Sequence, residues 1–444
     1  MWSSAVFLLV LLFCAQVFGA PKGNRKSAKT AMDSIADLPK VPPSVNTEVE
    51  EPTGGLTVEH AVAQALKQNP MLRAFRKERG IAEGQVITAT TFPNPSLQFQ
   101  LVHVQTGADM GFAVTLKWAP PQPVIYAANR SVARAHLTQI EHEIAEQEWQ
   151  LQFQVRNVHS LLLMLRKELH LCDELLARRQ KILESYKTRL EQGSATRIEI
   201  NQVRLALLSQ RRDCDNILLR EVDSQTRLRA LLGSLSVDHL SVTGSFSVFE
   251  KSAIPDADSL AELALSTRPA LKAAQAKLVQ RQQLLKIEKA RRWPWFELST
   301  RYRHTSSTNY PNEILVGIET PLAILDWNRG PIREAAAQVD LALGLAEAEF
   351  LALKQNVYNA HAALVVSRNI LHRYEHEVIP ILSEHEQLLE FSVRAGQMDV
   401  VTLLVAEETV LRARRDYFEA RLAFRQKWLA LEAAVGKRLV EDNP

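Results

Sequence analysis

The feature that most constrains the fold is an internal duplication. Turn-forming residues in the first half of the chain recur in the second half at offsets of 199 to 201 residues. The markers that pair in this way are Pro70 with Pro269, Pro93 with Pro294, Pro121 with Pro321, and Asn129 with Asn328. A self-similar period of this length predicts two structural repeats of the same architecture.

Each repeat is dominated by very long helices. No proline occurs between Pro123 and Pro255, so nothing in this stretch interrupts a helix. Apolar residues follow one another there in steps of three and four, which is the heptad seam of a coiled coil. The outgoing seam is Leu151, Val155, Val158, Leu162, Leu165, Leu169, Cys172, Leu176, Leu183, Tyr186 and Leu190, and the returning seam is Ile200, Val203, Leu207, Cys214, Ile217, Leu228 and Leu231. Gly193 lies between them and predicts the turn of an antiparallel hairpin.

The expected helix lengths are consistent with such rods. A helix over residues 129–192 would have 64 residues and a length of about 96 Å. Two shorter helices, over 57–89 and 197–232, together match it end to end. The second repeat follows the same scheme with helices over 257–291, 331–394 and 398–435, and Pro380 is expected to bend the long one.

Short alternating segments lie between the helices and predict two strands in each repeat. The segments 97–101, 112–118, 296–303 and 314–318 place apolar residues on one face and polar residues on the other. A soluble, half-buried sheet is one interpretation, and an outer-membrane barrel is the one we favour. Four strands cannot close a barrel, whereas three chains would supply twelve. The fold class is therefore mostly α with a small β part, in which a helical barrel continues into a trimeric, twelve-stranded β-barrel.

Charged residues on the strands should then line the lumen, and tryptophans at the strand ends should lie at the membrane interface. The predicted lumen residues are Lys117, Glu297, Arg301, Arg303 and Glu319. The interfacial tryptophans are Trp118, Trp293, Trp295 and Trp327.

The N-terminus predicts export. Residues 5–18 form an apolar run that is too short to span a bilayer but suits a signal peptide, which we place at 1–19. Lipidation of Cys14 is the alternative, although Phe13 fits that pattern poorly. The remaining organisation is an extended leader (20–55), a first repeat (56–240), a linker (241–256), a second repeat (257–436) and a C-terminal tail (437–444).

Composition and motifs do not indicate an enzyme. The net charge is only +3, which does not favour nucleic acid as a partner. Fingerprints of nucleotide, zinc-protease, hydrolase and redox sites are missing from the sequence. His372 and His376 have a spacing that can hold a metal, with His385 further along, but charged neighbours favour a solvated helix face. We therefore predict no catalytic, cofactor-binding or metal-binding residues.

The hairpin turns and two cysteines are the candidate functional positions. In a trimer, each turn residue forms a threefold ring, where opposite charges can latch a closed pore. The predicted periplasmic gate comprises Glu191, Gly193, Arg197, Glu199, Arg394, Gly396 and Asp399. Cys172 and Cys214 lie 21 residues before and after Gly193 on the facing seams, so they form a candidate disulfide, with two buried thiols as the alternative.

These features resemble the outer-membrane efflux protein family, the TolC-like exit ducts of tripartite pumps. The segments that carry the resemblance are L-T-V-E-H-A-V-A-Q-A-L-K-Q-N-P (56–70), P-N-P-S-L (93–97) and R-A-G-Q-M-D (394–399). The segment 320–335 is similar to the heavy-metal branch of this family.

The resemblance implies a homotrimer in the outer membrane, with its helical barrel in the periplasm. It further implies passive transport, with metal cations as one cargo, and partnership with a periplasmic adaptor and an inner-membrane pump. A duct for type I protein secretion would share nearly every feature. A soluble periplasmic coiled-coil scaffold is the alternative from a different class.

Overall fold

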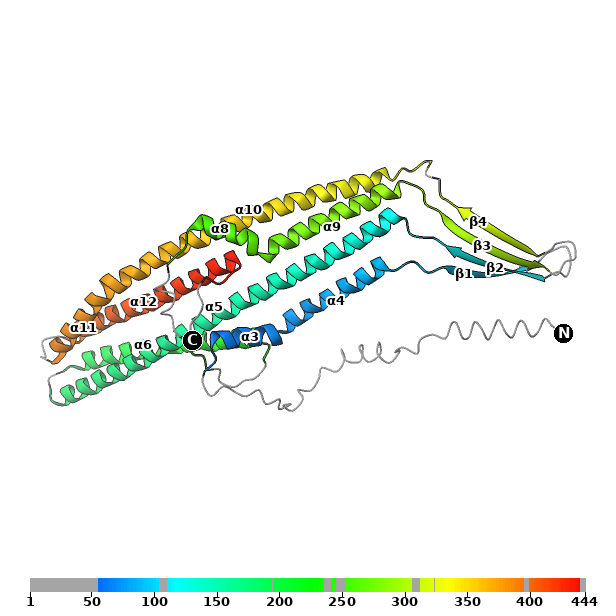
Figure 1. Ribbon diagram of the computed structural model, residues 1–444. Coiled ribbons are helices and arrows are strands. Elements are labelled where there is room, and N and C mark those ends of the chain that lie inside the picture. Colours follow the sequence, from blue (N-terminus) through cyan, green and yellow to red (C-terminus); the bar gives the residue numbers. More distant parts are fainter. Residues whose placement is uncertain are drawn as a thin grey trace. The chain divides into compact units, whose positions relative to one another are not determined.

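The computed structural model describes residues 55–103, 110–193, 195–234, 241–244, 253–305, 312–322, 324–394 and 399–439. The expected signal peptide, nearly all of the expected leader and the turn residue Gly396 lie outside these ranges. All described residues belong to one compact unit, in which the two repeats pack against each other. Figure 1 shows the strands at one end of this unit and the turns of the helical hairpins at the other.

The first repeat contains the expected helices with two differences: one helix is broken, and the long helix begins at Pro123 instead of residue 129. Its helices are α3 (Val58–Gln68), α4 (Pro70–Thr90), α5 (Pro123–Glu191) and α6 (Arg197–Leu232). The single helix expected over 57–89 is wrong, because the chain leaves the helical conformation at Asn69 (φ −55°, ψ 121°). A residue before proline is pushed away from helical ψ values. The Asn69 side chain then caps the next helix by accepting a hydrogen bond from the Leu72 N–H at 3.0 Å.

The second repeat shows the same break and an additional irregularity. Its helices are α8 (Ala257–Thr267), α9 (Pro269–Arg291), α10 (Arg329–Arg373), η1 (Tyr374–Val378), α11 (Ile379–Arg394) and α12 (Val400–Val435). The single helix expected over 257–291 is interrupted at Arg268, again before a proline. Directly before Pro380 the chain forms one π-helical turn, in which the Ile379 N–H donates to the Tyr374 carbonyl. A π turn lengthens the spacing between donor and acceptor, which helps to accommodate the missing N–H and bulky ring of Pro380.

Two equivalent cores hold the repeats near their centres. In the first repeat, α3, α5 and α6 bury leucines and alanines together with Val242 from the linker. In the second, α8, α10 and α12 pack around the fully buried Phe424 and Trp428. A buried ion pair between Arg156 of α5 and Glu432 of α12, 2.5 Å apart, connects the two repeats. The repeats therefore share one framework.

The last helix of each repeat ends on a glycine in the left-handed conformation. Gly233 (φ 73°) follows α6 and Gly436 (φ 80°) follows α12. A Cβ atom at Gly233 would lie 2.6 Å from the Gln68 carbonyl oxygen, so the space and the backbone both require glycine. These two glycines end the coiled-coil rods at matching places in the two repeats.

The strands form one antiparallel sheet in sequence order. They are β1 (Ser96–His103), β2 (Met110–Trp118), β3 (Glu297–Thr305) and β4 (Glu313–Glu319). Strands β2 and β3 come from different repeats and pair over eight residues, from Gly111 with Thr305 to Trp118 with Leu298. Strands β1 and β4 form the two edges of this sheet.

Candidate functional site

The sheet separates polar and apolar side chains onto opposite faces. Cross-strand partners share a face, and side chains alternate between faces along each strand. One register row joins Gln98, Thr115, Arg301 and Leu315, and the neighbouring row joins Leu97, Leu116, Thr300 and Val316. All five charged residues predicted to line a lumen lie on the first of these faces, which we call the polar face.

The charges of the polar face are largely paired with one another. The Lys117 ammonium lies 3.2 Å from the Glu297 carboxylate and 3.7 Å from that of Glu319. Arg303 forms an ion pair with Glu313, and the Arg301 Nε–H donates to the Thr115 hydroxyl at 3.1 Å. The face is therefore a hydrogen-bonded, nearly charge-balanced surface.

The opposite face, the apolar face, is exposed within the chain. Its most exposed members are Val316 at 78%, Ile314 at 73% and Leu97 at 71%. Phe99, Leu101, Leu116 and Ile318 belong to the same surface. A continuous apolar surface that is exposed in this way must be covered by lipid or by another protein surface.

The helical hairpin turns carry the predicted gate residues. Glu191 is the last residue of α5, Gly193 forms the turn in the left-handed conformation (φ 71°), and Arg197 begins α6. Arg394 ends α11, but its side chain lies outside the described residues, as does all of Gly396.

Two of the predicted gate carboxylates act as helix caps. Glu199 forms a capping box with Thr196: its carboxylate accepts from the Thr196 N–H at 2.5 Å, and its own N–H donates to the Thr196 hydroxyl. Asp399 accepts hydrogen bonds from the N–H groups of Val401 and Thr402 at 2.8 and 2.9 Å. These donated hydrogen bonds hold the pKa of both carboxyls below their ordinary values. Both carboxylates therefore stabilise the starts of helices, independently of any role in a gate.

The start of α12 packs against the first hairpin. Val400, the first residue of α12, is buried in a cluster with Leu183, Tyr186, Ile200 and Val203 of the first hairpin. The second hairpin is thus seated against the first close to its turn.

Cys172 and Cys214 form a disulfide between α5 and α6, and their Cα atoms lie 5.8 Å apart. The bond is buried beside Leu165 and Ile217, in the seam of the hairpin. The amide of the buried Gln210 donates a hydrogen bond to the Cys172 Sγ at 3.1 Å. The disulfide ties the two helices of the first hairpin together well away from its turn.

A buried arginine connects the two hairpins. Arg179 of α5 donates to the Ala206 carbonyl of α6 at 2.7 Å and lies 3.7 and 3.5 Å from the carboxylates of Glu407 and Glu408 of α12. Burial raises the pKa of Glu407, opposed by the charges of Arg179 and Arg178. The sequence analysis missed this group, although its signal was present: Arg179 occupies the seam position between Leu176 and Leu183, where an apolar residue is expected.

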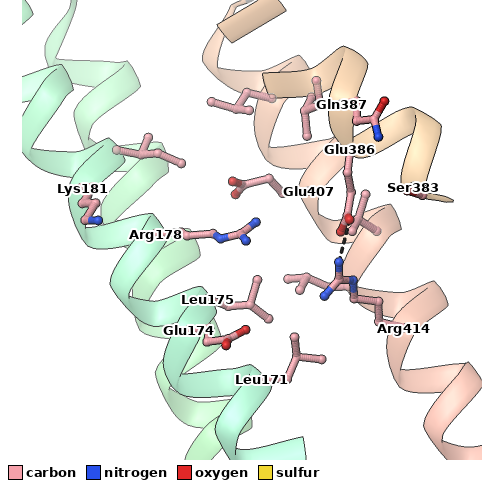
Figure 2. A pocket seen from close by; sticks show the side chains of 15 residues that line it. Leu171, Glu174, Leu175, Arg178, Lys181, Ser383, Glu386, Gln387, Glu407 and Arg414 are labelled. Atoms are coloured by element: carbon pink, nitrogen blue, oxygen red, sulfur yellow. Dashed lines mark hydrogen bonds and ion pairs between the residues drawn. The ribbon is translucent and has the colours of Figure 1, made fainter. Parts of the chain in front are cut away.

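A cavity of about 660 Å³, lined by both charged and apolar side chains, adjoins this contact. Figure 2 shows α5 on one side and α11 and α12 on the other, with Arg178 and Glu407 pointing toward each other. Arg414 of α12 pairs with Glu386 of α11 at 2.6 Å across its wall. The two hairpins are therefore joined here by charged groups around a hollow, instead of by a continuous apolar core.

His372 and His376 lie at an exposed position around the π turn, and the centroids of their rings are 4.1 Å apart. Among the described residues, no group of three or more His, Cys, Asp or Glu side chains is placed to hold a metal ion. None of the described helices is both long and apolar enough to cross a membrane.

A two-faced sheet with an exposed apolar surface, continued by long helical hairpins, defines the class of outer-membrane channel subunits. The family model described as outer membrane efflux protein matches residues 260–437. The cobalt-zinc-cadmium resistance protein CzcC of Cupriavidus metallidurans is 24% identical over 373 residues, covering 83% of this chain and 87% of that protein. The second repeat thus matches the outer membrane efflux protein family, and the chain as a whole is similar to CzcC.

Solved structures show the same fold. The CusC channel structure has a TM-score of 0.73 at 15% identity, covering 90% of this chain and 98% of that one. The outer membrane protein VceC of Vibrio cholerae has a TM-score of 0.68 at 18% identity, covering 86% of this chain and 96% of that one. The predicted fold class is thereby confirmed.

Proposed function

We propose that three copies of this chain form one efflux duct, each copy supplying four strands of a closed barrel. The single observation that carries this proposal is the sheet, which has two unpaired edges and one largely apolar, exposed face. Exposed backbone donors and acceptors are not tolerated in lipid, so the edges must be paired. Because an even number of antiparallel strands separates β1 from β4, the β4 edge of one copy can pair antiparallel with the β1 edge of the next.

The dimensions of the strands support a membrane-spanning role. A nine-residue strand such as β2 extends about 30 Å and, tilted by about 40°, covers roughly 23 Å. This is close to the apolar band of about 25 Å in outer-membrane barrels. With the apolar face toward lipid, Lys117, Arg301 and Arg303 line the lumen. The reverse orientation would cost on the order of 2–4 kcal/mol for each Arg or Lys near the midplane.

The helical hairpins form the periplasmic end in this proposal, and their turns form the gate. The Arg179 contact and the Val400 cluster hold the second hairpin against the first. Threefold repetition would bring Glu191, Arg197 and Arg394 into rings at the opening. A rise in conductance on loosening these turns is the behaviour expected of such a gate.

The partners are an inner-membrane pump and a periplasmic adaptor, and the cargo includes divalent metal cations. The metal assignment is supported by the similarity to CzcC, a resistance protein for cobalt, zinc and cadmium. A second relative, the pyoverdine export outer membrane protein OpmQ of Pseudomonas putida, is 26% identical over 294 residues and exports an organic molecule. A type I secretion duct stays the alternative within the class, whereas the similarity to outer-membrane efflux proteins argues against a soluble scaffold.

Cross-linking between neighbouring sheet edges tests the barrel. Gln98→Cys on β1 should form a disulfide with a cysteine on the polar face of β4, scanned at positions 313, 315 and 317. The expected product in native membranes is a covalent trimer on a non-reducing gel. Gln98→Cys alone and each β4 cysteine alone are the matched controls.

Conductance tests the duct directly. The purified protein should conduct ions in planar bilayers as a trimer. Monomeric protein in mild detergent, together with no conductance and no cross-linked trimer, would refute the proposal.

The gate is tested by replacing Arg197, Glu199, Arg394 and Asp399 singly and together with alanine or serine. Conductance should rise as the turns loosen. Because Glu199 and Asp399 cap helices, Arg197→Ala and Arg394→Ala are the more specific changes. Unchanged conductance in every variant would exclude these residues from the gate.

A further inference from the structure

The segment between β4 and α10 exposes three large apolar side chains. Leu322, Ile324 and Leu325, which we call the apolar loop, are 72%, 71% and 97% exposed. A leucine with nearly its entire surface uncovered is unusual in a folded chain, and three such residues in a row of four form a patch. Figure 1 shows the segment projecting from the unit between β4 and the start of α10.

The base of the loop is fixed at both ends. At its start, the Thr320 hydroxyl donates to the Trp295 carbonyl at 3.3 Å. At its end, the Asn328 side-chain amide donates to the Glu288 carbonyl of α9 at 2.7 Å, with Asn328 itself in the left-handed conformation (φ 55°). Hydrogen bonds at both ends therefore hold the apolar loop in a defined position.

The position-matched segment of the first repeat has a different structure. Pro121 corresponds to Pro321, but Leu322 is replaced there by the half-buried Gln122, and α5 begins at Pro123. Val124 and Ile125, which correspond to Ile324 and Leu325, therefore lie in a helix, and Val124 is only 45% exposed. The Pro120 carbonyl there accepts a hydrogen bond from the Trp295 indole at 2.6 Å. The exposed apolar loop is therefore a feature of the second repeat, because the first repeat is already helical at the matching residues.

The surroundings of the loop match the boundary of a bilayer. The apolar face of β4 ends at Ile318, only four residues before Leu322, so the two apolar surfaces are close in sequence. Beside the loop, the Arg292 guanidinium lies 5.4 Å from the Trp327 ring centroid, and Trp293 is 65% exposed. Tryptophan rings and arginine side chains gather at the level of lipid headgroups, where apolar stems and polar ends meet their preferred phases.

We propose that Leu322, Ile324 and Leu325 insert into the acyl region of the periplasmic leaflet of the outer membrane. Arg292 and Trp327 lie at headgroup level above them. The loop thereby anchors the second repeat at the junction of sheet and helices, outside the barrel wall. This inference rests on the proposed function, because it places the apolar face of the sheet in lipid.

Site-directed fluorescence in proteoliposomes tests the insertion. Single cysteines are introduced as Leu325→Cys, Val316→Cys and Gln122→Cys and labelled with bimane, while the native disulfide stays closed. Quenching by nitroxide lipids and by aqueous iodide is then compared. The Leu325 label should show blue-shifted emission, lipid quenching and protection from iodide, as the Val316 label should. The Gln122 label should show no lipid quenching.

The outcomes separate this inference from the function on which it rests. If Val316 is quenched by lipid but Leu325 responds to iodide, the apolar loop is in water and the inference fails while the barrel stands. If Leu325 responds to neither quencher, a second copy of the chain covers the loop, and the inference also fails. If Val316 itself is not quenched by lipid, the proposed barrel is refuted.

Discussion

Removal of the disulfide should loosen the first hairpin between the bond and the turn, with little effect elsewhere. Cys172 and Cys214 are 42 residues apart, and the chain-entropy model gives about 4 kcal/mol for closing a loop of that length. If local opening releases the whole constraint, the opening equilibrium rises by up to roughly 700-fold. The helical seam on either side remains, so the effect should be confined to this segment.

Serine is the appropriate replacement, because Gln210 is buried and donates its amide to the Cys172 sulfur. Alanine would leave that donor unpaired, at a cost of about 1–3 kcal/mol that has nothing to do with the bond. The double variant Cys172→Ser, Cys214→Ser keeps an acceptor in place and removes the constraint.

Hydrogen exchange measured by mass spectrometry is the direct assay. Peptides from 173–213 should exchange faster in the serine variant, and peptides from α10 serve as the internal control. Dithiothreitol should accelerate exchange in the wild type and leave the variant unchanged. Equal exchange in wild type and variant would refute the reasoning, as would complete alkylation of both cysteines without reductant.

Three further predictions concern the framework. Arg179→Ala should separate the hairpins, costing about 3–5 kcal/mol because Glu407 loses its buried guanidinium partner. Alanine at the exposed neighbour Gln180 should have little effect. Chemical denaturation and bilayer conductance measure both variants. The pKa of Glu199 is lowered in the folded protein. The stabilisation that its carboxylate provides is therefore present at pH values above the ordinary carboxyl pKa and is lost as the pH falls through the lowered pKa. The difference in thermal unfolding between Glu199→Gln and wild type should vanish well below about pH 4. Gly233→Ala should destabilise the protein by more than about 1 kcal/mol, whereas Gly344→Ala, in a helix with open space around it, should be neutral or stabilising in the same denaturation assay.

Much of the local structure follows from periodicity. The heptad steps through α5 and α6 place Leu162 and Leu228 in the seam, and both are fully buried. The alternation in β3 assigns Arg301 and Arg303 to one face, as the strand register shows. The helix breaks at Pro70 and Pro269 could have been read from the same sequence, since proline removes a donor and restricts the residue before it.

The sequence by itself determined the two repeats, the hairpins and the two-faced strands, because these depend on spacings within a few residues along one chain. Only the tertiary structure decided which charges meet. Arg179 reaches Glu407 and Glu408 across more than two hundred residues of sequence, and Glu199 and Asp399 turn their carboxylates onto backbone N–H groups at the helix starts. A long polar side chain has many rotamers and several partners within reach. The partner that it binds is therefore set by the packing of neighbouring helices, which no local sequence pattern specifies.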